Sequence, residues 1–261
     1  MIISLKNKKA LVGGSSGGLG KAIAMQLAAS GAIVTLLARN EEKLQKTLSE
    51  LPKEEGQEHR YIIADFSDFE NYRKILTKYF ENNTVDILVN NTNGPKAGSV
   101  LEKSEEDYEH AFSMLFQTVQ YSTTLALKHM QQNHWGRIIN LTSRTVKEPV
   151  ETLALSNTIR AAVTTWAKTL ANAVAKDGIT VNNILTGNFD TERLKQLFQL
   201  QANVQGTPLQ EIYDNATKQI PAQRLGKPEE IANVVTFLAS EQASYVTGTS
   251  IAVDGGLIKS L

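Results

Sequence analysis

Short apolar runs alternate with longer amphipathic stretches along the whole chain. The apolar runs are Ala10–Val12, Ile33–Leu37, Tyr61–Ile63, Ile87–Val89, Ile138–Leu141, Val181–Leu185 and Ile251–Val253. Amphipathic stretches of helical length lie between them, as at Lys21–Ser30, Glu41–Leu51, Phe69–Phe80 and Glu105–Met130. Strands that are apolar throughout, with helices between them, are typical of a parallel sheet covered on both faces. The pattern therefore predicts an α/β protein with a doubly wound parallel sheet, the Rossmann fold.

The composition narrows the classes of function. A chain of 261 residues with no repeat, linker or low-complexity segment is predicted to form a single domain over residues 1–261. Lys plus Arg and Asp plus Glu are 27 each, so no net charge attracts it to nucleic acid or membrane. The absence of cysteine excludes disulfides and thiolate metal sites and fits the cytoplasm. We expect neither a signal peptide nor a membrane span.

A glycine-rich turn follows the first predicted strand. It reads Gly13-Gly14-Ser15-Ser16-Gly17-Gly18-Leu19-Gly20, and a helix is expected from Lys21. Glycines in such a turn let the backbone approach a pyrophosphate, which lies at the helix N-terminus. Strand, glycine turn and helix in this order predict a dinucleotide site, although a flexible turn without ligand is the alternative. The predicted cofactor contacts here are Gly14, Ser16, Gly18, Leu19 and Gly20.

The end of the second predicted strand indicates which dinucleotide binds. It reads Leu37-Ala38-Arg39-Asn40, about 20 residues past the glycine turn, where NAD-binding chains usually carry Asp or Glu. No acid occurs before Glu41, and Arg39 can pair with a 2′-phosphate. The sequence therefore predicts NADP, with NAD less favoured; an exposed Arg at a strand end without a role is the alternative.

These motifs make the chain resemble the short-chain dehydrogenase/reductase family, especially its 3-oxoacyl-acyl-carrier-protein reductase-like members, over essentially its whole length. Beyond the glycine turn, the resemblance covers Asp65 and the degraded motif Asn90-Asn91-Thr92-Asn93. It continues through Thr186-Gly187-Asn188-Phe189-Asp190-Thr191 and the tail from Pro228 to Val253-Asp254-Gly255-Gly256. It implies cofactor contacts from Asp65, Asn90 and Thr191, and an oxidoreductase acting on a carbonyl or alcohol.

The resemblance also implies a catalytic set, and here the chain departs from the family. The family serine that holds the carbonyl corresponds to Ser143, after Ile138–Leu141. The family Tyr-x-x-x-Lys corresponds to Ser156-Asn-Thr-Ile-Arg160, and the supporting Asn position corresponds to Leu115. Ser143, Ser156 and Arg160 are the candidate catalytic residues, with Arg160 also expected at the nicotinamide ribose.

The substitutions change the chemistry available for proton transfer. A phenol with a pKa near 10 can be brought into working range by a neighbouring cation, whereas the shorter aliphatic hydroxyl of Ser156 is much less acidic. Arg160 keeps the positive charge but cannot relay a proton. Tyr108, Tyr121 and Tyr213 are possible replacements for the missing phenol, although packing is the favoured interpretation for Tyr121. The histidines, which show no metal-ligand spacing, are interpreted as surface or helix-end residues: His59, His110, His129 and His134.

The segment 192–219 is predicted to cover the substrate. It contains two helical stretches separated by Gly206-Thr207-Pro208. Its apolar positions either line a lipophilic site or pack the two helices against the body: Leu194, Leu197, Phe198, Leu200 and Leu209. The expected substrate is a small hydrophobic carbonyl or acyl compound.

Two functions therefore stay open. One is an NAD(P)-dependent oxidoreductase with an atypical site; the other is a catalytically impaired NADP-binding protein that acts as a sensor, scaffold or partner-binding module. The resemblance also implies a homotetramer, paired through the helix that carries Ser156 and through the Val253–Gly256 edge. The small residues of that helix suit close packing: Ala161, Ala162, Ala171, Ala173 and Ala175.

Overall fold

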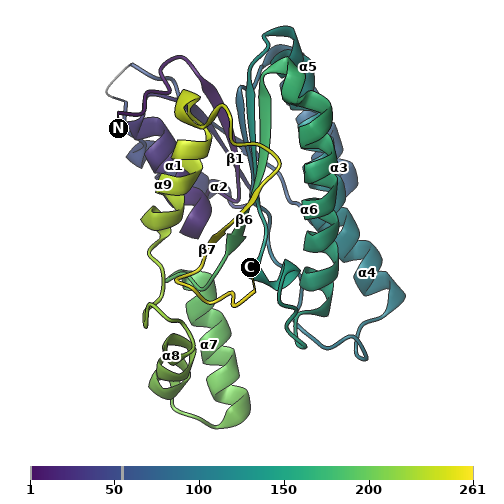
Figure 1. The fold of residues 1–261 in the computed structure, drawn as a ribbon, viewed down its shortest axis with the longest axis vertical. Helices are drawn as coiled ribbons and strands as arrows, with labels where there is room; N and C mark the ends of the chain where they lie inside the picture. The colour runs from purple at the N-terminus through teal and green to yellow at the C-terminus, as the bar shows by residue number, and fades with distance from the viewer. Residues whose placement is uncertain (1, 54–55, 261) are drawn as a thin grey trace.

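The computed structural model describes residues 2–53 and 56–260. Within these residues the chain forms one seven-stranded parallel sheet in the order β3-β2-β1-β4-β5-β6-β7 (Figure 1). The strands are β1 (Lys9–Gly13), β2 (Ile33–Ala38), β3 (Arg60–Ile63), β4 (Ile87–Asn90), β5 (Gly136–Leu141), β6 (Ile179–Thr186) and β7 (Ser250–Val253). Each contains the apolar run predicted at its position. The predicted single-domain, doubly wound α/β fold is confirmed.

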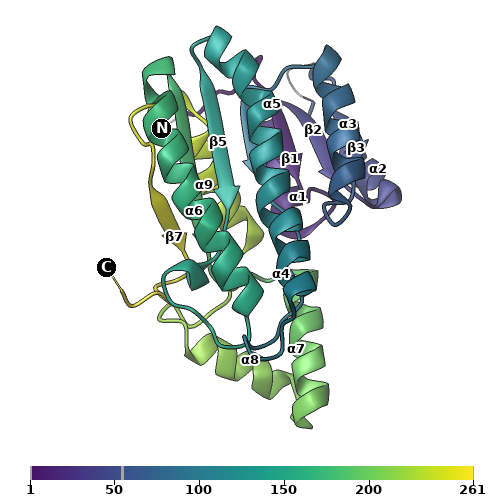
Figure 2. The same ribbon diagram turned by 90° about the vertical axis from the view of Figure 1, so that its right-hand side faces the viewer.

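Helices cover both faces of the sheet (Figures 1 and 2). The α-helices are α1 (Gly18–Ala29), α2 (Glu41–Glu50), α3 (Phe69–Asn82), α4 (Glu105–Phe112), α5 (Thr118–Gln132), α6 (Ala154–Val174), α7 (Glu192–Gln205), α8 (Leu209–Lys218) and α9 (Pro228–Leu238). One buried cluster joins α1 and α9 to the sheet, and a second joins α3, α5 and α6 to its other face. Val12 and Leu36 belong to the first cluster, and Leu11 and Leu37 to the second. Burial on both faces explains the continuous apolar runs.

Local side-chain chemistry sets where several helices begin and end. The side chains of Asn40 and Asp68 accept hydrogen bonds from the backbone of the first turns of α2 and α3. Ser104 forms a capping box with Asp107 at the start of α4. Gly206, in the left-handed region at φ 64°, ends α7.

The predicted helix over Glu105–Met130 is interrupted. Residues Ser113–Gln117 form a π-helix between α4 and α5. The Thr118 hydroxyl donates to the backbone oxygen of Met114 at 2.6 Å. Periodicity did not predict this interruption, because a single wide turn keeps the apolar face on the same side of the helix. π-Helical turns of this kind are frequent at functional sites.

The α7–α8 pair extends beyond the carboxyl end of the sheet, at the bottom of Figure 1. It has a small apolar cluster of its own, centred on Phe198, Ala202 and Ile212. The rings of Phe198 and Tyr213 meet edge to face, with centroids 4.9 Å apart. Within the described part of the chain, no helix is long and apolar enough to cross a membrane.

Candidate active site

The glycine turn leaves the N-terminus of α1 open. Gly17, the residue before α1, offers no side chain to cap the helix, and a Cβ added there would meet nothing within 4 Å. Gly20 is confined instead, because its added Cβ would lie 2.3 Å from the backbone oxygen of Gly14. Gly14 and Gly18 adopt positive φ angles of 58° and 53°. The first backbone amides of α1 therefore have no capping side chain, the arrangement that binds a phosphate group.

Two segments distant in sequence border this turn. Asn91 Nδ2 donates to the backbone oxygen of Gly13 at 3.0 Å. The Thr191 side chain lies 3.5 Å from a Cβ built on Gly18, and its hydroxyl accepts from the Leu194 amide as the N-cap of α7. The structure therefore brings Thr191 beside the glycine turn, as the sequence-based assignment requires.

The other predicted contacts of the turn differ in what they present. Ser16 is half-buried, and its hydroxyl has no hydrogen-bond partner among the described residues. Ser15, by contrast, is fully buried and accepts from the Leu37 amide at 2.9 Å. Leu19 is partly buried and packs against the core. Ser16 is therefore the hydroxyl of this turn that is free to contact a phosphate.

Arg39 and Asp65 lie side by side at the carboxyl ends of β2 and β3. Arg39 Nη1 is 3.6 Å from Asp65 Oδ2, and the Arg39 side chain is 66% exposed. Burial acts to raise the pKa of Asp65, but hydrogen bonds from the Ser67 hydroxyl and amide, together with Arg39, outweigh it and lower the pKa. Arg39 thus projects into solvent, where a 2′-phosphate can replace or join its carboxylate partner.

Asn90 points into the protein. Its Nδ2 donates to Asn140 Oδ1 at 2.8 Å and to Thr123 Oγ1 at 3.3 Å. Asn140 Nδ2 donates in turn to Asn183 Oδ1 at 3.0 Å, so amides on β4, β5 and β6 are linked at one register. Asn90 itself fixes the strand ends, and its assignment to the cofactor stays a prediction.

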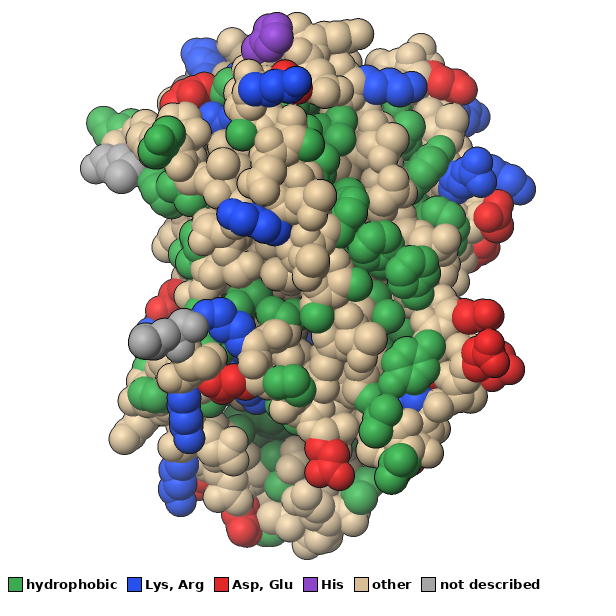
Figure 3. All heavy atoms as spheres, turned by 45° about the vertical axis from the view of Figure 1, so that its right-hand side comes forward, with side chains coloured by type: hydrophobic (Ala, Val, Ile, Leu, Met, Phe, Trp, Pro, Cys, Tyr) green, Lys and Arg blue, Asp and Glu red, His purple; other side chains and the backbone are tan. Residues whose placement is uncertain are grey.

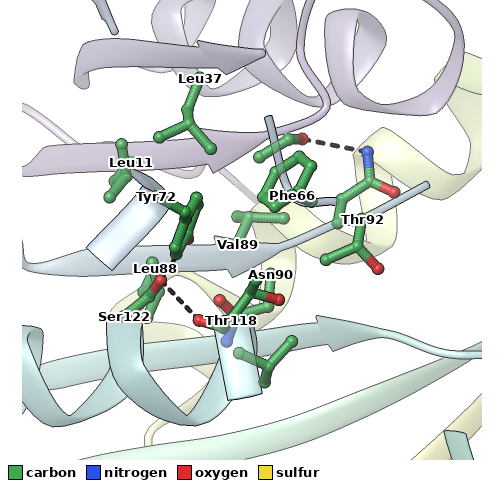
Figure 4. A pocket seen from close by; sticks show the side chains of 13 residues that line it. Leu11, Leu37, Phe66, Tyr72, Leu88, Val89, Asn90, Thr92, Thr118 and Ser122 are labelled. Atoms are coloured by element: carbon green, nitrogen blue, oxygen red, sulfur yellow. Dashed lines mark hydrogen bonds between the residues drawn. The ribbon is translucent and has the colours of Figure 1, made fainter. Parts of the chain in front are cut away.

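A small hollow lies beside Asn90, between β1, β4 and α5 (Figure 4). Phe66 and Thr92 are part of its lining, and Tyr72 bonds to the Ser122 hydroxyl on the wall. Burial raises the pKa of Tyr72, so its hydroxyl stays protonated. Sequence reasoning did not single out Phe66 or the side chain of Asn91. Phe66 could have been found from its position directly after Asp65, which is a predicted cofactor contact.

Ser143 ends the segment after β5 with its hydroxyl arranged as a donor. Ser143 Oγ accepts from the Thr145 amide at 3.2 Å and from the Thr145 hydroxyl at 3.0 Å. With both acceptor positions used, the Ser143 O–H has its proton left to donate. The residue is half-buried, and α6 packs against the short helix Arg144–Val146 that follows it. A carbonyl oxygen is the natural acceptor for such a hydroxyl.

Ser156 and Arg160 lie on the first turns of α6. The Ser156 hydroxyl has no hydrogen-bond partner among the described residues. Arg160 Nη1 donates to the backbone oxygen of Leu141 at 2.8 Å. Burial and the neighbouring charge of Arg193 lower the pKa of Arg160 to about 10, so it stays protonated at neutral pH. Leu115, on the π-helix, is 1% exposed and offers no polar group.

Among the described residues, no tyrosine hydroxyl forms a hydrogen bond with Ser143, Ser156 or Arg160. Tyr121 bonds to the Thr77 hydroxyl, and Tyr213 packs its ring on Phe198. Tyr108 packs against the second core cluster. The other tyrosine hydroxyls form hydrogen bonds away from the site or are exposed: Tyr61 bonds to Glu41, Tyr72 to Ser122 and Tyr79 to Thr35, and Tyr245 is fully exposed. The packing interpretation of Tyr121 fits its edge-to-face contact with Phe69.

The interpretation of the histidines needs one correction. His59 is 9% exposed and lies inside the protein, accepting from the Val34 amide at 3.0 Å and bonding to the Pro52 oxygen at 2.7 Å. His129 meets Asp86 at 3.1 Å, a carboxylate partner that the sequence pattern did not reveal. Among the described residues no group of His, Cys, Asp and Glu could hold a metal ion.

Comparison with known proteins identifies the family to which this chain belongs. The family model described as enoyl-(acyl carrier protein) reductase matches residues 14–258. The chain belongs to the short-chain dehydrogenase/reductase family. The 3-oxoacyl-[acyl-carrier-protein] reductase FabG of Aquifex aeolicus is 31% identical, with 98% of this chain and 100% of that protein covered. The NADPH-dependent reductase BacG of Bacillus subtilis is 30% identical, with 98% and 100% covered.

Solved structures of related proteins share the fold over the whole chain. The L-sorbose reductase of Gluconobacter frateurii, complexed with NADPH and L-sorbose, superposes with a TM-score of 0.93 at 28% identity, and both chains are covered completely. The prediction of a short-chain oxidoreductase type is confirmed by these relatives. The likeness covers the whole length, so Ser156 and Arg160 lie inside a complete family fold.

Proposed function

We propose that this protein is an NADP-dependent oxidoreductase that interconverts a carbonyl and an alcohol in an atypical active site. The observation that carries the proposal is the Ser143 hydroxyl, a free donor on the same edge of the sheet as the open N-terminus of α1. A carbonyl oxygen bound by Ser143 would be held next to a dinucleotide whose phosphates lie at Gly17 and Gly18. Binding and orientation of this kind supply much of the rate of a hydride transfer.

The residues present fit NADP. Open space above Gly17 and the placement of Thr191 suit the pyrophosphate, and exposed Arg39 suits a 2′-phosphate. When bound, the nicotinamide supplies the hydride. Ser143 polarises the carbonyl, and Arg160 places a fixed positive charge beside the strand end, where developing negative charge on oxygen is stabilised. Ser156 can orient a water molecule through its unpartnered hydroxyl, because it is too weak an acid to act as the tyrosine does.

A catalytically impaired NADP-binding protein is the second candidate. The specific observation in its favour is that none of the described tyrosines forms a hydrogen bond with Ser143, Ser156 or Arg160, and five of the seven are bonded or exposed elsewhere. A sensor or scaffold would keep the cofactor edge and need no acid. Loss of a positioned acid costs about 10²- to 10⁴-fold in rate, which slows a reductase without stopping it.

The segment 192–219 is proposed to cover the substrate. Leu194, Phe198 and Leu209 pack between α7 and α8, which supports the packing interpretation for these three positions. Leu197 and Leu200 are 43% and 61% exposed, so they are the positions left to contact an apolar ligand. We therefore favour a substrate with an apolar portion.

A homotetramer is proposed from the free faces of the molecule. Figure 3, with α6 toward the viewer, shows a face whose middle has hydrophobic and uncharged side chains and few charged ones. Phe112, 41% exposed, stacks on Phe116, which in turn meets Trp166 of α6. Among the described residues β7 pairs only with β6, so its other edge is open for a second contact. Light scattering at micromolar concentration should give four chains; a monomer would reject the assembly.

Two measurements test the proposed function. Calorimetric titration should show tighter binding of NADPH than of NADH. NADPH consumption should then be followed with a panel of ketones, aldehydes and 3-oxoacyl thioesters, and slow but saturable turnover is expected. Binding of NADPH without consumption on any substrate would support the impaired NADP-binding protein instead.

A further inference from the structure

Arg193 is a cation without a carboxylate partner. It is the second residue of α7, and its Nη2 donates to the backbone oxygen of Gly94 at 3.4 Å, across from the loop after β4. Within the described residues no carboxylate lies within 4 Å of its guanidinium. The neighbouring carboxylate of Asp190 is taken by Lys195 at 3.4 Å. Because a cation in the first turn of a helix opposes the helix dipole, this placement does not stabilise α7.

Arg160 is a second unbalanced cation close to the first. It also donates to a backbone carbonyl, that of Leu141, two residues before Ser143, and has no carboxylate within 4 Å among the described residues. Burial and, to a smaller extent, the charge of Arg193 lower the pKa of Arg160. Arg193 itself is exposed, so its guanidinium is accessible to a ligand. Both cations thus bond to backbone carbonyls at or just beyond the carboxyl ends of β4 and β5, the edge of the sheet that also carries Ser143.

The Gly94 contact leaves Arg193 free to exchange partners. The bond is long and goes to a neutral carbonyl, whereas a carboxylate would offer the guanidinium two short, charge-assisted bonds. A Cβ on Gly94 would lie 2.7 Å from Arg193 Nη2, so a larger residue at this position would displace the flexible end of the Arg193 side chain. Arg193 extends toward Gly94, while Thr191 of the same segment faces Gly18. The guanidinium is therefore directed to the loop after β4, whereas Thr191 borders the glycine turn that is proposed to hold the pyrophosphate.

From this geometry we infer that Arg193 binds a carboxylate of the substrate, and that the protein acts on oxo acids or their hydroxy-acid counterparts. Ser143 would hold the carbonyl, Arg193 the carboxylate, and exposed Leu197 and Leu200 an apolar side chain. The inference deepens the proposed function and rests on it for the site, but binding of the acid requires no turnover.

The test uses an acid and its ester as a matched pair. The probes are 2-oxo-4-phenylbutanoate and its ethyl ester, and pyruvate and methyl pyruvate. Each is titrated by calorimetry into the protein saturated with NADPH, and NADPH consumption is followed in parallel. At least one acid should bind about 10- to 100-fold more tightly than its ester, the scale of a charge-assisted interaction. Arg193→Gln should remove that preference, and Arg193→Lys should restore part of it.

The controls distinguish carboxylate binding by Arg193 from a role at the cofactor phosphates and from the proposed reductase activity. Lys195→Gln removes a positive charge from the same helix and should leave the acid preference unchanged. If neither acid binds more tightly than its ester, the inference is overturned. If Arg193→Gln weakens NADPH while the acid preference stays, Arg193 serves the cofactor phosphates and the inference is overturned as well. Selective binding of an acid without its reduction would uphold the carboxylate site and refute the proposed reductase activity.

Discussion

The cofactor edge and the reaction edge of this molecule lie on the same end of one sheet, yet they differ in how tightly packing determines their residues. The cofactor edge, formed by the glycine turn, Asn91 and Thr191, is tightly determined by packing: Gly20 cannot hold a Cβ, and Asn91 is bonded to Gly13. The reaction edge, formed by Ser143, Ser156, Arg160 and Arg193, is loosely determined. The Ser156 hydroxyl is unpartnered among the described residues, and the guanidiniums bond only to backbone carbonyls.

The difference shows that the fold places few demands on the reacting residues. The backbone of α6 is held by apolar positions such as Ile159 and Val163, which are buried whatever occupies 156 and 160. At the cofactor edge, in contrast, positions such as Gly20 belong to the strand–helix packing and cannot change without loss of stability. The reacting residues can therefore change while this packing is retained.

The largest effect is expected from a double variant that introduces the family residues at the reaction edge. The double variant Ser156→Tyr with Arg160→Lys supplies a phenol and a neighbouring ammonium, so turnover of the panel ketones should rise by about 10²-fold or more. Initial rates at saturating NADPH measure it. The single variants serve as controls, because each supplies only half of the pair. Brisk turnover by the unaltered protein would show that another residue is the acid and that the assignment of Ser156 is wrong.

The next effect concerns the cofactor edge. Arg39→Asp should weaken NADPH binding by about 1.5–3 kcal/mol, the scale of a hydrogen bond to a charged group, and bring the NADH affinity closer. Arg39→Ala should cause part of this loss without adding an acid beside Asp65, 3.6 Å from Arg39. Arg60→Ala, which removes an exposed cation from β3, is the matched control. Equal affinity of the unaltered protein for the two cofactors would contradict the role given to Arg39.

A pair of glycine variants separates packing from binding at the same edge. Gly20→Ala would force a methyl group to 2.3 Å from the Gly14 oxygen and should reduce the free energy of unfolding by about 1–3 kcal/mol. Gly17→Ala meets nothing within 4 Å, so its unfolding should be unchanged while NADPH binds more weakly. Urea unfolding and calorimetry measure the two quantities. Unchanged NADPH affinity in Gly17→Ala would place the pyrophosphate elsewhere.

The sequence predicted the fold better than the site for identifiable reasons. Apolar runs locate strands buried on both faces, so all seven strands were found at their positions. Motifs give the identity of a residue but not the direction of its side chain, so the bond from the Asn90 amide to Asn140 could not be predicted, while the assignment of Asn90 to the cofactor stays a prediction. Arg193 was not singled out, because its partner Gly94 is 99 residues away and the contact depends on the path of α7. His59 was misplaced because nothing local in the sequence marks its bonds to Val34 and Pro52.

The smallest expected effect is a pH dependence of the free energy of unfolding, which comes from His59 and not from the residues of the reaction edge. Burial lowers the pKa of His59 below its ordinary 6.5, so the folded protein resists its protonation. As the pH falls through 6.5, the unfolded chain binds a proton that the folded protein does not, and stability decreases by at most about 1.4 kcal/mol per pH unit until the folded pKa is reached.

Urea unfolding at pH 5, 6, 7 and 8 should show this decline, and His59→Gln should flatten it. His110→Gln, at an exposed position on α4, should keep the decline of the unaltered protein. Arg160, with a pKa of about 10, stays charged over the whole range. A decline that persists in His59→Gln would assign the pH dependence to another group.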